Sequence, residues 1–198
     1  MTRIILASSS ATRQALLRSA GLEFEAVPAA VDEAALKEAA RADGFSPADA
    51  AILLAEAKAI RIARREPEAL VIGADQLLVC DGQWFSKPEN REAAREQLVA
   101  LRNRTHTLFT AQVLWRHGQR VWHHVAAPKL TMRDFSEPFL DRYLAAEGEA
   151  VCASVGAYRL EGLGVQLFRE IEGEHSAILG LPLLPLLGFL RQHGLLQG

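Results

Sequence analysis

Apolar and polar positions along the chain predict an alternation of short strands and helices. The first apolar run, Ile4 to Ala7, is followed by three serines, which favours a strand that ends in a turn. Residues Ala11 to Ala20 then have helical spacing, and Gly21 is a stop signal. Leu22 to Val27 predicts a second short strand. The opening therefore predicts strand, turn, helix and strand in that order.

Helical signals dominate the next part of the chain. The acidic, alanine-rich segment from Asp32 to Asp43 predicts a helix over part of its length. Ser46 is suited to cap a second helix, with proline in the first turn and Asp49 at the capping-box position. This helix is expected to run to about Arg65, because Pro67 prevents its continuation.

The centre of the chain contains the longest predicted strands. Ala69 to Gly73 predicts a strand, and the apolar run resumes at Leu77 to Cys80 before an Asp-Gly turn. Asn90 is suited to cap a helix that reaches Arg102. The later predicted elements are β segments from Thr107 to Arg116 and from Gln119 to Arg133, a helix from Ser136 to Gly148, a glycine-punctuated strand region from Gly156 to Ile171, and an apolar helix from Leu183 to His193.

This order of elements predicts an α/β fold, with a mixed, strongly curved sheet and flanking helices. Strands and helices alternate, but a central β-hairpin argues against a purely parallel sheet. We expect a single domain over residues 1–198, with two lobes around a cleft. The helix-rich stretch from Glu33 to Arg65 and the centre of the chain are the candidates for those lobes.

Composition narrows the class of partner. Hydrophobic residues make up 49% of the chain and charged residues 23%, which is the balance of a globular protein. The formal charge of −2 disfavours a nucleic acid polymer as partner and leaves a small anionic ligand open. Pro182 and Pro185 interrupt the most apolar stretch, so no membrane span is expected. The two cysteines match no zinc spacing, and without a signal-peptide pattern we expect a cytoplasmic protein.

The first predicted turn has the composition of a phosphate site. Ser8 and Ser10 lie between a strand and a helix, and Arg13 follows in the first turns of that helix. A helix N-terminus offers unpaired N–H groups and partial positive charge, and an arginine fork can hold two phosphate oxygens. The alternative is that the serines only cap the helix and the arginine is solvated.

A lysine and two carboxylates are further candidates. Lys58 shares a helix face with apolar residues, so it either snorkels to water or points at a bound anion. Asp75 interrupts a run typical of a buried strand, so it should meet a cation, a metal or water at a strand end. A solvated turn acid is the alternative for Asp75. Glu33 is a possible second metal carboxylate, and Lys87 is either held over a phosphate or exposed in a turn.

In their order and spacing these residues resemble the Maf-like family of nucleoside triphosphate pyrophosphatases, over nearly the whole chain. The matching segments are Leu6 to Leu17, Val31 to Glu33, Ala55 to Ala59, Ile72 to Gln76, Asp81-Gly82 with Lys87-Pro88, Gly156 to Gly162 and Ile178 to Pro182. The resemblance implies an inosine-triphosphatase-like fold with a nucleotide cleft and a homodimer. It implies metal-dependent hydrolysis of a nucleoside triphosphate to the monophosphate and pyrophosphate, with Mg²⁺ or Mn²⁺ as cofactor.

The resemblance also implies roles for individual residues. Asp75 would be the proton acceptor and would bind the metal with Glu33. Ser8, Ser10, Arg13, Lys58 and Lys87 would hold phosphates, which agrees with the roles that their chemistry favours.

Three positions separate the branches of the family by base, and they carry Thr12, Gln76 and Glu161 here. Gln76 and Glu161 favour the 7-methyl-GTP branch, because a carboxylate can accept hydrogen bonds from guanine and attracts a cationic ring. Thr12 departs from the aromatic residue usual in that branch. Val155 replaces a common lysine, and Thr110-Ala111 replaces a common Thr-Gly pair.

Two other functions remain open from the sequence. One is a pyrophosphatase for deaminated or oxidised purine nucleotides. The other is a nucleotide-binding regulator of cell division in which turnover is incidental. A panel of nucleotide substrates separates these functions from each other.

Overall fold

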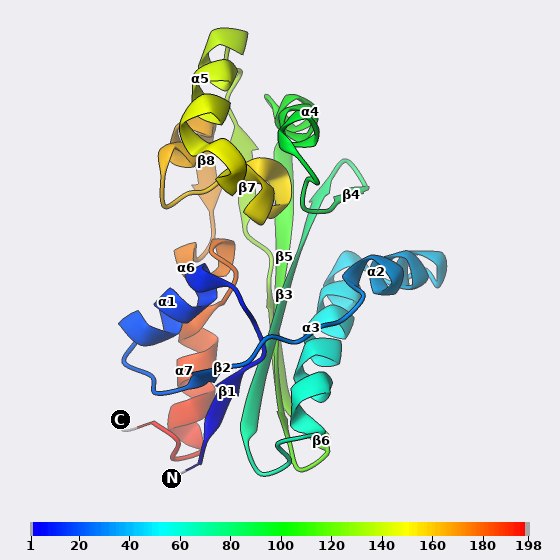
Figure 1. Cartoon of the computed structure of the whole chain (residues 1–198), viewed down its shortest axis with the longest axis vertical. Coiled ribbons are helices and arrows are strands. Elements are labelled where there is room, and N and C mark those ends of the chain that lie inside the picture. The colour runs from blue at the N-terminus through cyan, green and yellow to red at the C-terminus, as the bar shows by residue number, and fades with distance from the viewer. Residues whose placement is uncertain (1, 197–198) are drawn as a thin grey trace. The chain divides into compact units, whose positions relative to one another are not determined.

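The computed structural model of the chain describes residues 2–196 (Figure 1). The strands are β1 (Ile4–Leu6), β2 (Glu25–Ala26), β3 (Leu70–Cys80), β4 (Gln83–Phe85), β5 (Thr105–Arg116), β6 (Gln119–Ala126), β7 (Lys129–Met132) and β8 (Phe168–Glu172). The α-helices are α1 (Ala11–Ser19), α2 (Glu33–Ala42), α3 (Pro47–Ala63), α4 (Arg91–Leu101), α5 (Glu137–Glu147), α6 (His175–Ile178) and α7 (Leu183–Gln192). Short 3₁₀ helices cover Gly148–Ala153, Val155–Ala157 and Leu163–Leu167.

The strands form a mixed sheet, as the sequence predicts. Their order is β2-β1-β3-β5-β7-β8, with β4 paired to β3 and β6 paired to β5. β1 runs parallel to β2 and β3, whereas the β3–β4, β5–β6, β5–β7 and β7–β8 pairs are antiparallel. Within the described residues the sheet is open, because its two outermost strands do not pair with each other. The strand order does not support the strong curvature that we expected.

The chain divides into two compact units, which are described separately. Unit 1 contains the residues up to Gln76, residues 109–126 and the residues from Glu174 onward. Unit 2 contains residues 77–108 and 127–173. β3 and β5 therefore contribute residues to both units. Among residues 2–196, no helix has the length and apolar character needed to cross a lipid bilayer.

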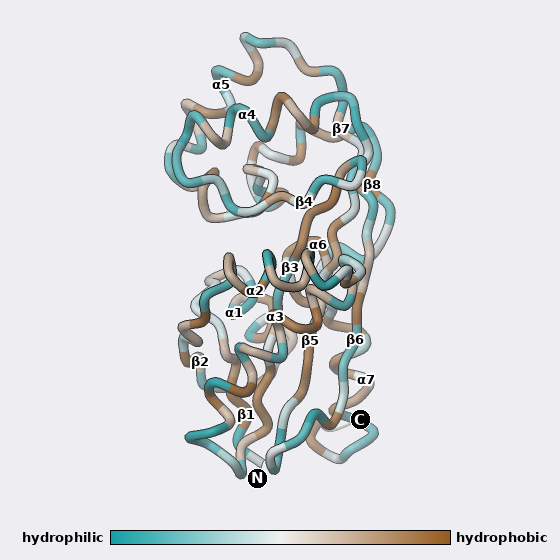
Figure 2. The backbone as a smooth tube through the Cα atoms, turned by 90° about the vertical axis from the view of Figure 1, so that its right-hand side faces the viewer, coloured by the Kyte–Doolittle hydropathy of each residue, from teal (hydrophilic) through white to brown (hydrophobic). Residues whose placement is uncertain are grey.

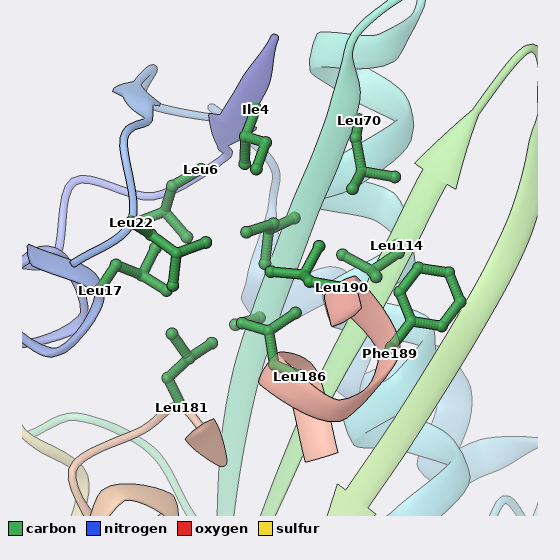
Figure 3. Close-up of a cluster of buried hydrophobic side chains, with 12 residues drawn as sticks. Ile4, Leu6, Leu17, Leu22, Leu70, Leu114, Leu181, Leu186, Phe189 and Leu190 are labelled. Carbon is green, nitrogen blue, oxygen red and sulfur yellow. The ribbon is translucent and has the colours of Figure 1, made fainter. Parts of the chain in front are cut away.

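Unit 1 buries both faces of its part of the sheet. Figure 3 shows one face, where alternate residues of β1 and β3 such as Leu6 and Leu70 pack against α1 and α7. The intervening residues Ile5 and Val71 point to the opposite face and pack against Ile62 of α3. This period-two alternation explains why short runs of consecutive apolar residues form these strands. Figure 2 shows hydrophobic stretches along β3 and β5.

The helix starts predicted from the sequence are confirmed. Ser46 caps α3 by accepting a hydrogen bond from the Asp49 N–H at 3.1 Å. Asn90 caps α4 and Ser136 caps α5 in the same way. These side chains satisfy backbone donors that a helix leaves unpaired in its first turn.

The predicted strand region from Gly156 to Ile171 is wrong over most of its length. Two 3₁₀ helices occupy part of it, and the strand in this region is β8, which begins at Phe168. Gly156 and Ala157 have φ values of 80° and 59°, in the left-handed region that a strand does not allow. The glycines in this segment therefore mark tight turns rather than breaks between strands.

Three other boundaries differ from the prediction. The expected segment from Gln119 to Arg133 is divided into β6 and β7, and Pro128, which lies between them, cannot donate a ladder hydrogen bond. The expected strand from Leu22 to Val27 shortens to β2. β3 continues without a break through Asp75, where the sequence suggested a strand end.

Candidate active site

A buried lysine joins two carboxylates in unit 1. The Nζ atom of Lys58 lies 2.6 Å from Oδ1 of Asp75 and 2.7 Å from Oε1 of Glu33. Lys58 is 7% exposed and Asp75 is 5% exposed, so both charges are almost completely removed from water. Each charge compensates the desolvation of the other, which explains how an acid can occupy the middle of a buried strand.

Close packing of α3 on β3 places Lys58 beside Asp75. A Cβ atom on Gly73 would lie 2.0 Å from the carbonyl oxygen of Ala55 and 2.9 Å from the Cβ of Ala59. Only glycine therefore allows the helix backbone to approach the strand this closely. The small side chains on this face of α3 bring the lysine within reach of the acid two residues beyond the glycine.

Asp75 has one oxygen that the lysine does not use. Its Oδ2 atom is buried and has no hydrogen-bond partner among the described residues. Glu33 enters the cluster from the first turn of α2, whose cap is the side chain of Asp32. The two carboxylates and the ammonium thus come from a strand and two helices.

The N-terminus of α1 carries the predicted serines. Ser10 caps the helix, with its Oγ accepting from the Arg13 N–H at 3.3 Å, and the Ser10 N–H donates to Ser8 Oγ at 3.2 Å. Ser8 is buried and Ser10 is half-buried. The capping role is confirmed for Ser10, and the N-terminus of α1 remains an anion-binding candidate.

Arg13 is held by the backbone of a distant segment. Its Nε donates to the carbonyl oxygen of Gly180 at 2.8 Å. Burial lowers the pKa of Arg13, and the charges of Asp75 and Glu33 oppose that change. The guanidinium therefore lies within the electrostatic reach of both carboxylates. The alternative that Arg13 is a solvated side chain is therefore wrong.

The three positions expected to separate substrates lie in different surroundings. The Nε2 of Gln76 donates to Thr110 Oγ1 at 2.9 Å and lies within 3.2 Å and 3.0 Å of the carbonyl oxygens of Ala177 and Ile178. Thr12 is half-buried in the first turn of α1.

Glu161 and Lys87 belong to unit 2. Oε1 of Glu161 lies 3.9 Å from Nε of Arg159, whose Nη1 donates to Glu147 at 3.2 Å. Lys87 is exposed in the segment that follows β4. Within unit 1, Lys58 joins Glu33 and Asp75, both of which interact electrostatically with Arg13, and Ser8 and Ser10 lie at the N-terminus of the helix that carries Arg13. Lys87 and Glu161 are described within the other unit.

Sequence reasoning missed the contribution of the segment around Gly180. The motif Ile178 to Pro182 contributes to the family resemblance, but no side-chain pattern indicates that its backbone binds Arg13 and Gln76. Backbone carbonyls have no sequence signature of their own. The glycine itself was a signal that the sequence did contain, because a positive φ favours glycine and Gly180 has a φ of 102°.

The candidate metal ligands of the site are two carboxylates. Among residues 2–196, no group of three or more histidine, cysteine or acidic side chains could hold a metal ion. The two carboxylates of the cluster are hard oxygen ligands, and Mg²⁺ often takes only one or two of these together with substrate phosphates and water.

Comparison with known proteins assigns the family. The family model described as Maf-like protein matches residues 3–193. A relative from Granulibacter bethesdensis named nucleoside triphosphate pyrophosphatase is 56% identical, covering 96% of this chain and 97% of its own. A relative from Mesorhizobium japonicum named 7-methyl-GTP pyrophosphatase is 50% identical, covering 99% and 98%.

A solved structure from Mycobacterium abscessus, described as a dITP/XTP pyrophosphatase, has a TM-score of 0.41 and 16% identity, covering 77% of this chain and 97% of its own. That similarity is too low to assign a fold. The family match spans the positions of Glu33, Lys58 and Asp75, and the two relatives align over almost the whole chain. This chain belongs to the Maf-like family.

Proposed function

We propose that this chain is a nucleoside triphosphate pyrophosphatase, which hydrolyses its substrate to the nucleoside monophosphate and pyrophosphate. The observation that carries the proposal is the contact of the buried Lys58 with the buried Asp75 and the partly exposed Glu33, together with the electrostatic interaction of both carboxylates with Arg13. A purely structural ion pair would not require the unpartnered Oδ2 of Asp75 or the electrostatic interaction with Arg13, and both features suit a catalytic site. The names of relatives at 50–57% identity support the same activity.

The cationic groups of unit 1 suit a polyphosphate. The N–H groups at the start of α1 and the guanidinium of Arg13 bind phosphate oxygens, with Ser8 and Ser10 adding hydroxyl groups. Lys58 balances negative charge that accumulates near Asp75. We propose that Lys87 of unit 2 also contacts a phosphate, as the family resemblance implies.

Asp75 is the proposed proton acceptor. Its Oδ2 takes a proton from a water molecule whose oxygen forms a bond with the α-phosphorus. The bond between the α-phosphorus and the bridging oxygen breaks, and pyrophosphate leaves with the electron pair. Lys58 holds Oδ1 of the same carboxylate and so fixes its orientation during the transfer. No covalent intermediate is needed.

The residues present also fit a divalent cation. Glu33 and Asp75 supply carboxylate oxygens, which are the hard ligands that Mg²⁺ takes in ones and twos together with substrate phosphates and water. Mg²⁺ or Mn²⁺ bound here would neutralise phosphate charge and favour the departure of pyrophosphate. We propose that these two acids hold the ion.

We propose that the substrate is a modified purine nucleotide, with 7-methyl-GTP as the first candidate. Glu161 is a hydrogen-bond acceptor for the guanine edge and favours a cationic ring. Threonine at position 12 cannot stack on the base, which weakens selectivity. Hydrolysis of such a nucleotide in the cytoplasm would prevent its incorporation into nucleic acid, and we propose a homodimer as the active form.

Product analysis tests this proposal. Purified protein is incubated with Mg²⁺ and dTTP, UTP, CTP, GTP, 7-methyl-GTP or inosine triphosphate in ¹⁸O-labelled water. The proposal predicts pyrophosphate as product, with the label in the monophosphate and the highest kcat/KM for 7-methyl-GTP. Label in pyrophosphate would exclude attack at the α-phosphorus. Preference for inosine triphosphate would favour the deaminated-purine function, and binding without turnover would favour a regulator.

A further inference from the structure

The Gln76 side chain holds the C-terminus of α6. Its Nε2 is close to three acceptors, namely Thr110 Oγ1 and the carbonyl oxygens of Ala177 and Ile178. The last carbonyls of a helix lack partners in the regular helical pattern, so the amide adds a donor to two acceptors at the end of α6. The orientation of the amide follows, because the oxygen of Gln76 would repel the same two carbonyls.

The backbone beyond α6 closes in a tight, defined turn. The Gly180 N–H donates to Ala177 O at 3.0 Å, and the Leu181 N–H donates to Ser176 O at 3.0 Å. This hydrogen-bond pattern is a Schellman motif, in which the residue after the cap has a positive φ. Gly180 is that residue, with φ of 102°. The position of its carbonyl is therefore determined by the end of α6.

The same turn is anchored on its other side. Gln112, which is fully buried on β5, donates through Nε2 to the carbonyl oxygen of Pro182 at 2.8 Å. Glu174 accepts from the Leu183 N–H at 3.0 Å and also from the hydroxyl of Ser176. Side chains from the sheet and from the segment itself thus hold the whole turn.

This turn presents its carbonyl to the candidate phosphate-binding arginine. Gly180 O accepts from Arg13 Nε at 2.8 Å, and a Cβ atom on Gly180 would lie 3.1 Å from that nitrogen. The contact fixes the plane of the guanidinium and leaves its terminal nitrogens for other acceptors. Gln76 is thereby connected to Arg13 through the turn, by the carbonyls of Ala177 and Ile178 at one end and that of Gly180 at the other.

We infer that Gln76 is a positioning residue for Arg13, acting through the α6 turn. This inference rests on the proposed role of Arg13 in phosphate binding. It adds a role for position 76, because a residue that acts through a phosphate contact affects the binding of every nucleotide, whatever its base. All the contacts that carry it lie within unit 1.

Inorganic triphosphate is the probe that tests the inference, since it has phosphates but no base. Binding is measured calorimetrically in the presence of Mg²⁺ for the full chain and for Gln76→Met, which keeps the length of the side chain and removes the amide. We expect the Kd for triphosphate to rise about tenfold, the size expected for loss of a contact to a charged group. Gln119→Met, at an exposed glutamine of the same unit, is the matched control and should leave the Kd unchanged.

A double-mutant cycle with Arg13→Lys separates positioning from general loss of structure. Lysine keeps the positive charge but cannot hold Gly180 O and a phosphate with one planar group. In that background Gln76→Met should raise the Kd by less than about twofold, because the contact that it acts through is already gone. Equal effects in both backgrounds would contradict the inference.

Two further outcomes are decisive. Gly180→Ala disturbs Arg13 directly and should weaken triphosphate binding even if Gln76→Met does not fold, as checked by thermal unfolding. An unchanged triphosphate Kd in Gln76→Met, with an altered preference between 7-methyl-GTP and dTTP, would show that Gln76 contacts the base. Triphosphate binding needs no turnover, so it tests the role of Gln76 alone. If the proposed enzymatic activity is wrong, the unmodified chain will release no pyrophosphate, and that result is obtained in a separate assay.

Discussion

Lys58 and Asp75 form a buried ion pair with a separation of 2.6 Å between Nζ and Oδ1. The pair connects α3 to the middle of β3, and Glu33 extends it to α2 at 2.7 Å from the same nitrogen. The lysine is thus a structural counter-ion and, in the proposed function, a group that fixes the orientation of the reacting carboxylate. These two roles make separate predictions.

Substitution Asp75→Asn is predicted to separate binding from catalysis. The amide keeps the size of the side chain but cannot accept a proton from water, so kcat should fall by about 1,000-fold. Triphosphate binding should change much less, because the arginine and the α1 N-terminus are intact. Steady-state kinetics and calorimetry measure the two quantities. Asp81→Asn, at an exposed acid just beyond β3, is the control and should retain full activity.

Removal of the lysine charge is predicted to destabilise the protein more than removal of both charges. Lys58→Met leaves the buried Asp75 carboxylate uncompensated and should lower the free energy of unfolding by about 3 kcal/mol. The double variant Lys58→Met/Asp75→Asn should recover part of that loss. Urea denaturation measures both. A double variant that is less stable than Lys58→Met would show that the pair is not coupled as its geometry implies.

Close approach of α3 and β3 gives a third prediction. Gly73→Ala places a Cβ against Ala55 O and should cost about 2–3 kcal/mol of stability while displacing Lys58 from Asp75. Turnover should therefore fall as well. Gly188→Ala is the matched control, because a Cβ at that position of α7 meets no atom within 4 Å. It should be neutral or stabilising, since alanine is the better helix former.

The metal role of Glu33 is tested through cation dependence. Glu33→Gln removes one proposed carboxylate ligand and should raise the Mg²⁺ concentration for half-maximal rate by about tenfold. Excess chelator should abolish activity in the unmodified chain. Glu38→Gln, at an exposed position of the same helix, is the control. Activity that is insensitive to chelator would contradict the metal assignment.

Unit 2 gives a prediction about pH. His106 is 1% exposed, its Nε2 lies 2.8 Å from the hydroxyl of Tyr158, and burial lowers its pKa from 6.5 to about 4. A histidine with a depressed pKa contributes stability that is present above pH 6.5 and is lost as the pH falls toward 4, because the unfolded chain binds the proton more tightly. Between pH 7 and pH 5 this amounts to about 2 kcal/mol.

The control for that prediction is His106→Gln, which cannot titrate. Chemical denaturation at the two pH values should show a smaller pH dependence in the variant than in the unmodified chain, by about 2 kcal/mol. Identical pH dependence would show that another group accounts for the acid sensitivity.

Sequence patterns predicted those features that depend on local chemistry. Ser46 and Asn90 were identifiable as helix caps because the side chain and its backbone partner are three residues apart. The mixed sheet followed from strands separated by helices and by a hairpin. The acidic character of Asp75 also marked it as a site residue, because an unpaired buried carboxylate is costly.

Features that depend on distant residues could not be obtained in this way. The sequence placed Asp75 at a strand end, because the compensating Lys58 lies 17 positions away on a helix. The contact between Arg13 and Gly180 spans 167 positions and involves a backbone carbonyl, which no side-chain pattern reveals. Gly156 and Ala157 likewise have positive φ values, and they lie in a 3₁₀ helix where the sequence predicted a strand.

Pyrophosphate release by the unmodified chain and by Asp75→Asn tests the central claim most directly. Both proteins are assayed with Mg²⁺ and the same set of nucleoside triphosphates, after calorimetry has established that each binds triphosphate. Our account predicts stoichiometric pyrophosphate and monophosphate from the unmodified chain, and almost none from the variant. Equal release by the two proteins would remove Asp75 from the mechanism, and absence of release by both would contradict the proposed enzymatic function.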